Sequence, residues 1–348
     1  MVNKKKKVLI SGYIGFQNFG DDVLLAVLTK HLKEKNCEIK AFSSNPQDTM
    51  ENFSIKAVPY KNIFAILKEI LNTDILISGG GNLIQNETST LSLLYYCFII
   101  ILSKLLFKKV IVFSQGIGPI YGKFQNFIAK LALRCSDMIT VRDIYSQRIL
   151  SKWGINSKFT YDACWNFETP EYKPKNIVGL QVRNYQYLHK DFYKFLAKYV
   201  DMFFSDFEIN IFSFQNANDT KACYELERAL KQRNMNLKTK VILYKNPNQI
   251  AEEFSKLKYL IAMRLHANIL GLKLGVKIVP ASYSVKVRNL AYEFDLKYFE
   301  ASEEPNLHPI LTDLTIEEQE NPKIKNARSR KFEWSYIDSI IDKKRIKR

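Results

Sequence analysis

Short apolar runs alternate with longer amphipathic stretches along the first half of the chain. Runs of four or five residues are typical of buried parallel strands, and stretches with apolar residues every three or four positions are typical of helices. The pattern predicts strands over residues 8–11, 39–42, 75–78, 110–114 and 138–141. It predicts helices over residues 21–35, 62–71, 89–107, 124–135 and 144–153.

The alternation stops around residues 168–175, where Pro170 and Pro174 stand among charged residues, and then starts again. Two prolines in such a segment favour a linker between domains. Beyond it the pattern predicts strands over residues 177–182, 208–214, 241–244, 259–263 and 277–281. Predicted helices cover residues 190–204, 219–232, 247–257, 266–274 and 285–294, and a polar stretch over 300–330 precedes a last helix near 335–344.

These patterns predict an α/β protein with two doubly wound, Rossmann-like domains that face a cleft. We place the first domain at residues 1–168, the linker at 169–176 and the second domain at 177–348, a length that suits two domains. In open parallel sheets, ligands bind beyond the carboxyl ends of the strands. Functional side chains are therefore expected directly after the predicted strands.

The net charge of +17 favours an acidic partner, such as a phosphorylated substrate or an anionic membrane, although a solvated lysine-rich surface is the alternative. No zinc-finger spacing or RNA-binding aromatic signature is present, so we expect no nucleic-acid partner. Five scattered cysteines without a CxxC pair predict reduced thiols and no metal site, as in a cytoplasmic protein. The apolar segment 91–107 is interrupted by Lys104, which favours a buried helix; a membrane-docking helix is the alternative.

The tripeptide Arg264-Leu265-His266 lies where a predicted strand meets a predicted helix. A helix N-terminus presents free N–H groups and a positive dipole, which favours anions. Arginine adds a planar fork that suits carboxylate or phosphate, and histidine can move a proton near neutral pH. The tripeptide therefore offers anion binding and proton transfer within one turn of chain, with a purely structural histidine as the alternative.

Two glycine-containing loops follow strands of the first domain. In residues 11–22 the glycines let the backbone turn sharply, and Asn18 and Asp21 are polar candidates, although Asp21 can also cap the next helix. In residues 78–89, three glycines expose backbone N–H groups, and the polar side chains that can bond sugar hydroxyls are Asn82, Gln85 and Glu87. Neither loop has the GxGxxG spacing of dinucleotide sites.

Three further cations follow predicted strands. Arg142 closes a first-domain strand and Arg183 a second-domain strand, so both are expected to point into the crevice. Lys286 lies near the start of a helix, one strand–helix unit after His266. For Arg142, an ion pair with the adjacent Asp143 is the alternative.

Over roughly residues 8–295 the chain resembles the polysaccharide pyruvyl transferase family, most closely its CsaB-type branch. The motifs that carry the resemblance are, in chain order, Gly12-Tyr13-Ile14-Gly15 with Asn18-Phe19-Gly20-Asp21, the triple glycine 79–81 with Gln85 and Ser89, Tyr95-Tyr96, Gln115-Gly116-Ile117-Gly118-Pro119, Val141-Arg142-Asp143 and Arg264-Leu265-His266.

The resemblance implies a GT-B-like fold and a transfer of the enolpyruvyl part of phosphoenolpyruvate to a sugar. The product is a cyclic ketal, phosphate is released, and phosphoenolpyruvate is a co-substrate, so no cofactor is expected. The implied acceptors are cell-envelope glycans, often still carried on a polyprenyl diphosphate. We therefore expect a cytoplasmic protein at the inner face of the cell membrane.

Site roles follow from the same resemblance. His266 is the expected general acid, and the expected donor-binding residues are Arg142, Arg183, Arg264 and Lys286. The expected acceptor-binding residues are Asn18, Asp21, Asn82, Gln85 and Glu87; either Asp21 or Glu87 takes the hydroxyl proton or only orients the acceptor. A nucleotide-sugar glycosyltransferase of the same architecture and a non-enzymatic anion-binding protein are the competing interpretations.

Overall fold

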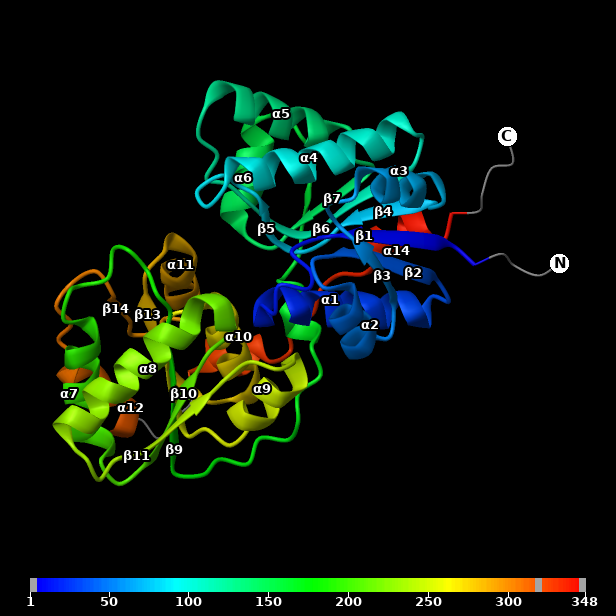
Figure 1. The fold of residues 1–348 in the computed structure, drawn as a ribbon. Helices are drawn as coiled ribbons and strands as arrows, with labels where there is room; N and C mark the ends of the chain where they lie inside the picture. Colours follow the sequence, from blue (N-terminus) through cyan, green and yellow to red (C-terminus); the bar gives the residue numbers. More distant parts are fainter. Residues whose placement is uncertain (1–4, 317–320, 344–348) are drawn as a thin grey trace. The chain divides into compact units, whose positions relative to one another are not determined.

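The computed structural model describes residues 5–316 and 321–343. The chain divides into two compact α/β units (Figure 1). Unit 1 comprises Met1–Phe16, Gly20–Phe167 and Lys331–Arg348, and unit 2 comprises Gln17–Phe19 and Glu168–Arg330. Both contain a parallel sheet, which confirms the predicted fold class.

The sheet of unit 1 has the strand order β3-β2-β1-β4-β6-β7-β8, with β5 paired to β6. Its strands are β1 (Lys7–Ser11), β2 (Glu38–Ser43), β3 (Lys56–Pro59), β4 (Ile75–Ser78), β5 (Gly81–Ile84), β6 (Lys109–Ile117), β7 (Met138–Val141) and β8 (Lys158–Phe159). The helices that connect them are α1 (Phe19–Glu34), α2 (Pro46–Phe53), α3 (Ile63–Leu71), α4 (Thr90–Leu105), α5 (Lys123–Arg134) and α6 (Ile144–Lys152). Helices α1 and α2 cover one face of the sheet, and α3, α4 and α5 cover the other (Figure 1).

The central strands of unit 1 are apolar along their whole length because helices cover both of their faces. Every residue of β4 is buried, and so is every residue of β6 after Lys109. A strand that is buried on both faces shows a continuous apolar run rather than alternation. Most of the apolar segment 91–107 lies in α4, which begins after the N-cap Ser89 and buries Leu93, Cys97 and Ile100 against this sheet.

The sheet of unit 2 has the order β11-β10-β9-β12-β13-β14 and is also parallel. Its strands are β9 (Ile177–Gln181), β10 (Glu208–Phe212), β11 (Lys238–Ile242), β12 (Tyr259–Ala262), β13 (Lys277–Ser282) and β14 (Phe299–Glu300). Its helices are α7 (Phe192–Phe204), α8 (Asn216–Arg233), α9 (Pro247–Phe254), α10 (Leu265–Leu274), α11 (Val285–Glu293), α12 (His308–Ile316) and α13 (Pro322–Ala327).

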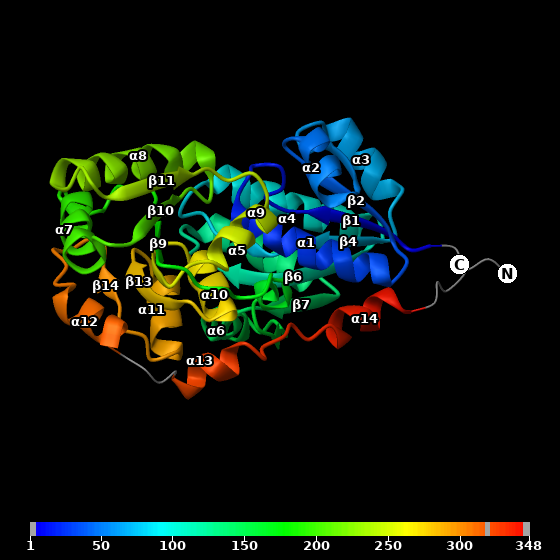
Figure 2. The same ribbon diagram turned by 90° about the horizontal axis from the view of Figure 1, so that it is seen from below.

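The end of the chain differs from the predicted domain boundaries. Residues 331–343, which we placed in the second domain, pack on unit 1, where α14 (Ser335–Ile341) lies against β7 (Figure 2). Phe332 is 2% exposed with its ring 4.9 Å from that of Phe113, and the indole of Trp334 stacks on His31 at 3.8 Å. These aromatic side chains need a core to bury them, and the sequence pattern does not say which one. At the other end, Phe19 belongs to unit 2, where its N–H donates to the Phe214 carbonyl.

Candidate functional site

The carboxyl ends of β1, β4, β6 and β7 lie side by side at one edge of the unit 1 sheet. Ser11 of β1 is in register with Ser78 of β4, and Gln115 of β6 is in register with Val141 of β7. Parallel strands direct the loops that follow them to the same edge. The glycine-containing loops of residues 11–22 and 78–89 and the predicted site residue Arg142 therefore emerge together.

Two glycines allow side chains to approach the backbone closely at this edge. A Cβ on Gly81, whose φ is +100°, would lie 2.6 Å from Oδ1 of Asp21. A Cβ on Gly116 would lie 2.5 Å from Oδ1 of Asn82 and 3.4 Å from Nε of Arg142. Only a residue without a side chain leaves room for these contacts. The structure thus brings the predicted residues Asp21, Asn82 and Arg142 around one short stretch of β5 and β6.

Arg142 forms a buried ion pair at this edge. Its Nη1 donates to Oδ2 of Asp162 at 2.8 Å, and both side chains are 6% exposed. Burial by itself lowers the pKa of the Arg142 guanidinium, but the carboxylates of Asp162 and Asp143 outweigh it and raise that pKa above its ordinary value. Asp143 caps α6 by accepting a hydrogen bond from the Ser146 N–H. Arg142 therefore stays charged, and Asp162 is its hydrogen-bonded partner.

Several buried polar atoms at this edge of the sheet have no protein partner among the described residues. The side chain of Gln115 is fully buried, and neither its amide nitrogen nor its amide oxygen has a partner. Oδ1 of Asn82 also has no partner, whereas its Nδ2 donates to the Gly118 carbonyl. The hydroxyls of Ser11 and Ser78 also have none. An unsatisfied buried polar group costs about 1–3 kcal/mol. Donors and acceptors that the fold itself does not satisfy are what a site for a polyhydroxyl ligand needs.

The remaining acceptor candidates of this loop have other contacts. Nε2 of Gln85 donates to the Thr88 hydroxyl at 2.6 Å, and its Oε1 accepts from the Thr88 N–H, so this side chain closes the loop before α4. Glu87 is exposed in the same loop. None of the described contacts of Gln85 or Glu87 reaches Asp21, Asn82 or Arg142, so their acceptor-binding role remains a prediction.

Unit 2 presents its cations at the carboxyl edge of β10, β9, β12 and β13. These strands are neighbours in the parallel sheet, so the segments after them share one edge. Arg183 follows β9, Arg264 follows β12, and Lys286 lies in the first turn of α11 after β13. The structure therefore gathers three of the predicted donor-binding residues along one edge of one sheet.

Arg264 is held by a fully buried carboxylate. Its Nε donates to Oδ2 of Asp219 at 2.8 Å and its Nη2 to Oδ1 at 2.6 Å, while the Asp219 side chain is 0% exposed. Oδ2 of Asp219 also accepts from the N–H groups of Phe214 and Gln215. The Arg264 N–H donates to Oε1 of Gln181 at 2.7 Å. The arginine thus has a fixed orientation, and Asp219 balances its charge.

Asn18 lies beside the same cluster, in unit 2 rather than in the first domain. Its Nδ2 donates to Oε1 of Gln215 at 3.4 Å, and Nη2 of Arg264 donates to the same oxygen at 3.4 Å. Asn18 and Gln215 also form an antiparallel backbone bridge. Asn18 was predicted to bind the acceptor from the first domain, so its assignment to unit 2 is a correction.

His266 occupies the first turn of α10, and it is half-buried. The turn that precedes it is fixed by Asn268, whose Nδ2 donates to the carbonyls of Ala262 and Arg264. Lys286 is likewise half-buried in the first turn of α11. Two helix N-termini, each with a positive dipole, therefore point toward this edge together with the side chains.

Arg183 is oriented by an aromatic ring. Its Nη1 donates to the Tyr283 hydroxyl at 3.0 Å, and its guanidinium carbon lies 4.9 Å from the centre of the Tyr283 ring. Tyr185 packs edge-on against the same ring at 5.1 Å. This stacking keeps a charged group close to the strand ends at a small entropic cost.

Sequence reasoning did not identify the residues that orient the predicted arginines. Asp162 and Asp219 are far along the chain from Arg142 and Arg264, and Gln181 reaches Arg264 from another strand. One usable signal exists: Gln181 and Gln115 are polar residues inside apolar strand runs. A buried strand excludes such residues unless they are hydrogen-bonded or bind a ligand.

The fold is shared with known enzymes of nucleotide-sugar metabolism. A putative UDP-N-acetylglucosamine 2-epimerase from Listeria monocytogenes superposes with a TM-score of 0.66 at 12% identity, over 98% of this chain and 98% of its own. Anabaena HepE, solved with UDP-glucose, gives 0.65 at 11% identity, over 97% and 98%. S. aureus MnaA, solved with UDP, gives 0.66 at 11% identity, over 96% and 95%. At these identities the likeness shows the fold, a GT-B-like pair of Rossmann-like units.

Sequence comparison gives a more specific result. No curated protein matches the chain. The family model for polysaccharide pyruvyl transferase matches residues 18–285, which is more than half of the chain and includes most of the strand-end residues described above. The chain therefore belongs to the polysaccharide pyruvyl transferase family.

Proposed function

We propose that this protein transfers the pyruvyl group of phosphoenolpyruvate to a sugar of a cell-envelope glycan as a cyclic ketal and releases phosphate. The observation that supports it best is the edge of unit 2, where His266 stands in a helix first turn beside the oriented Arg264. Phosphoenolpyruvate carries a carboxylate and a phosphate on one small frame, so its site needs several cations. Arg183 follows β9 and Lys286 follows β13, the two strands that flank β12 in that sheet.

We further infer that these cations have different roles. Asp219 already balances the charge of Arg264 and Asp162 that of Arg142, so neither arginine adds a full uncompensated charge. In this proposal Lys286 and Arg183, with the helix N-termini of α10 and α11, contact the anionic groups of the donor. Arg264 contributes directed N–H groups and, through its position, fixes the start of the helix that carries His266.

The chemistry then follows in balanced steps. Protonated His266 gives its proton to the methylene carbon of phosphoenolpyruvate, which makes the adjacent carbon electrophilic. The oxygen of one sugar hydroxyl attacks that carbon and its proton leaves. The oxygen of a second hydroxyl forms the other C–O bond as the phosphate C–O bond breaks. Of the two hydroxyl protons released, one restores His266 and the other is taken up by phosphate.

The acceptor belongs, in this proposal, to the polar edge of unit 1. The unsatisfied amide of Gln115 and the Oδ1 of Asn82 offer a donor and acceptors for sugar hydroxyls, and Asp21 is the nearby carboxylate. The acceptor sugar is carried on a polyprenyl diphosphate. The protein then works at the inner face of the cell membrane, where a net charge of +17 favours contact with anionic lipid.

The test is phosphate release from phosphoenolpyruvate, with and without a glycan fraction extracted from cell envelopes. We expect acceptor-dependent release that falls by at least about a hundredfold in His266→Ala, with donor binding largely kept. His308→Ala, at an exposed histidine of α12, is the matched control and should retain full activity. Full activity in His266→Ala would remove that residue from the mechanism. No release, together with consumption of a nucleotide sugar, would assign the protein to the glycosyltransferases.

A further inference from the structure

Helices α3, α4 and α5 carry apolar side chains on both of their faces. Their inner faces pack against the sheet of unit 1 through one shared core, to which α3 contributes Ile70, α4 contributes Ile100 and α5 contributes Leu133. All three helices lie on the same side of that sheet (Figure 1). Their outer faces are therefore turned away from the core together, and nothing in the fold of unit 1 requires those faces to be apolar.

The outer faces nevertheless form apolar stripes. On α4 the exposed residues Leu91, Phe98 and Leu105 recur every seven positions, which places them on one side of the helix. On α5 the exposed Phe124 and Phe127 lie one turn apart. Each stripe repeats at helical spacing, so these are second hydrophobic faces rather than scattered surface residues.

Helix α3 and the end of α4 extend the same pattern. Phe64 of α3 is 83% exposed, and Phe107, just after α4, is 89% exposed. We call the exposed apolar residues of these three helices the apolar face; its most exposed members are Phe64, Leu91, Leu105, Phe107 and Phe127. Large exposed apolar patches on soluble proteins mark contacts with other proteins or with membranes.

The charges of these helices are nearly all positive. Residues 61–71, 90–109 and 121–134 contain one acidic residue, Glu69, which is 9% exposed and bonded to Lys40. The exposed side chains of Lys61, Lys68, Lys109 and Lys123 belong to the same segments. Apolar side chains flanked by lysines, with no exposed carboxylate in these segments, complement a surface that is apolar inside and anionic outside.

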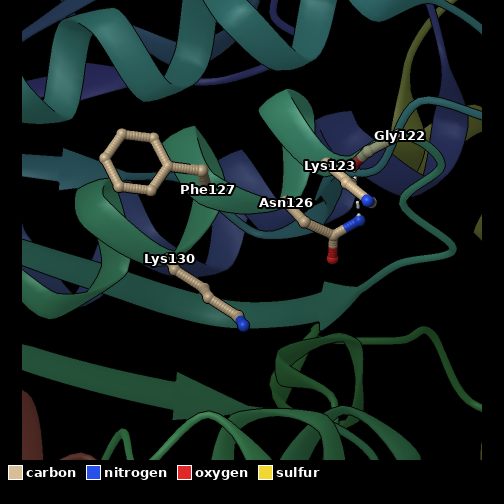
Figure 3. Close-up of a pocket in the computed structure, with 5 residues that line it drawn as sticks. All are labelled: Gly122, Lys123, Asn126, Phe127 and Lys130. Atoms are coloured by element: carbon tan, nitrogen blue, oxygen red, sulfur yellow. Dashed lines mark hydrogen bonds between the residues drawn. The ribbon is translucent and has the colours of Figure 1, made fainter.

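A hollow on α5 shows the two features side by side. Gly122, Lys123, Asn126, Phe127 and Lys130 line a volume of about 510 Å³ (Figure 3). Lys123, Asn126 and Lys130 lie along one side of the helix, and Asn126 is fixed there by hydrogen bonds to the carbonyls of Ile120 and Gly122. The helix that carries the exposed phenyl ring of Phe127 therefore also carries two lysines, a combination that suits a lipid surface with phosphate headgroups above acyl chains.

We propose that the apolar face of α3, α4 and α5 binds the surface of an anionic bilayer, with the aromatic and leucine side chains inserted and the lysines at headgroup level. Among the described residues no helix has the length and hydrophobicity that a membrane crossing requires, and α4 itself has 16 residues, so the contact is interfacial. The lysines favour a bilayer over a second copy of this chain, whose identical face would repel it. This proposal rests on the proposed function in one respect: the lipid-linked acceptor explains why the protein meets a membrane.

The experiment is flotation of the full-length protein with vesicles of phosphatidylcholine alone and with phosphatidylglycerol added. We expect binding that rises with the anionic lipid and weakens about tenfold or more in Phe64→Glu and in Leu91→Glu. Met235→Glu, at an equally exposed apolar residue of unit 2, is the matched control and should bind as the unaltered protein does. Circular dichroism spectra confirm that each variant is folded.

A second set of variants tests the contribution of the lysine charges. The double variant Lys123→Glu/Lys130→Glu should lose the dependence on phosphatidylglycerol, whereas Lys194→Glu/Lys221→Glu, on α7 and α8, should keep it. Equal flotation of all variants overturns the proposal. It is also overturned if the unaltered protein binds no vesicles but forms a dimer in solution that Phe64→Glu dissociates. Phosphate release with a detergent-solubilised acceptor is measured in parallel: its absence in the unaltered protein, with vesicle binding intact, refutes the proposed function and leaves this surface standing.

Discussion

The guanidinium of Arg264 and the carboxylate of Asp219 form a two-point contact, with distances of 2.8 and 2.6 Å, 45 positions apart in sequence. Arg142 and Asp162 make the corresponding pair in unit 1 at 2.8 Å. In each unit an arginine just beyond the end of a strand is therefore bonded to a buried aspartate. The buried aspartates fix the orientation of both guanidinium groups within their own units.

Breaking the Arg264–Asp219 pair should be costly. Asp219→Asn keeps the shape of the side chain but leaves the guanidinium, which is 12% exposed, without its counter-charge. Removing one member of a buried pair costs about 3–5 kcal/mol, so we expect a loss of about 3 kcal/mol in the free energy of unfolding, measured with urea. Asp201→Asn, which breaks the partly exposed pair with Arg233, is the control and should cost under about 1 kcal/mol. Equal losses would contradict this account.

Lys286 should act mainly on donor affinity. If its ammonium group contacts phosphoenolpyruvate, Lys286→Met raises KM for that donor about tenfold, with little change in kcat. Arg288 lies in the same helix but is bonded to Glu300 at 2.9 Å, so Arg288→Met should leave KM unchanged. A fall in kcat with KM unchanged would instead place Lys286 in the chemical step.

Gln115 offers a test that separates binding from stability. Its amide is buried and has no protein partner among the described residues, so Gln115→Leu should leave the free energy of unfolding unchanged or raise it by up to about 3 kcal/mol. If the amide binds acceptor hydroxyls, the same variant should raise KM for the acceptor about tenfold. Gln232→Leu, at an exposed position of α8, controls for the change in composition. A large loss of stability would show that the amide is satisfied within the fold.

Asp137 should make the stability of unit 1 depend on pH. Burial raises the pKa of its carboxyl, but Lys104, Lys109 and the Val110 N–H more than offset this, so the pKa lies below its ordinary value. The folded state then holds the ionised form more tightly than the unfolded chain does. The stabilisation is fully present above the unfolded-state pKa of about 4 and is lost as the pH falls through the lower folded-state pKa.

We therefore expect Asp137→Asn to lower the free energy of unfolding by about 1–2 kcal/mol at neutral pH and the difference to shrink in acid. Urea unfolding at a series of pH values measures it. Asp206→Asn, at an exposed aspartate, controls for the change in formal charge. A difference that stays constant with pH would mean that the ion pairs do not stabilise the fold.

Local pattern was sufficient for most of the sheet strands, because β1, β4 and β12 are short apolar runs that two layers of helices must cover. It was not sufficient for β5: the triple glycine was expected to form a loop, but Gly81–Ile84 pairs with β6 instead. Residues 46–59, which form α2 and β3, carry too few apolar residues to show a period.

In the candidate site, too, some features follow from the sequence and others do not. The strand-end positions of Arg142, Arg264 and Lys286 follow from sequence, because a parallel sheet fixes where its loops emerge. Their partners do not follow, since Asp162 and Asp219 are brought to the arginines only by the packing of distant elements. Arg264 was expected to bind the donor, and that role stays a prediction; its two-point contact with Asp219 could not be foreseen from the sequence.

The return of residues 331–343 to unit 1 has a consequence for how the protein is made. A chain emerging from the ribosome has all of unit 2 available once residue 330 has been synthesised, but unit 1 then still lacks Phe332 and Trp334. Domains usually complete their folding in the order of synthesis. Here the unit that starts the chain is the last to be finished, and a truncation before Phe332 removes core side chains from the half of the protein that was translated first.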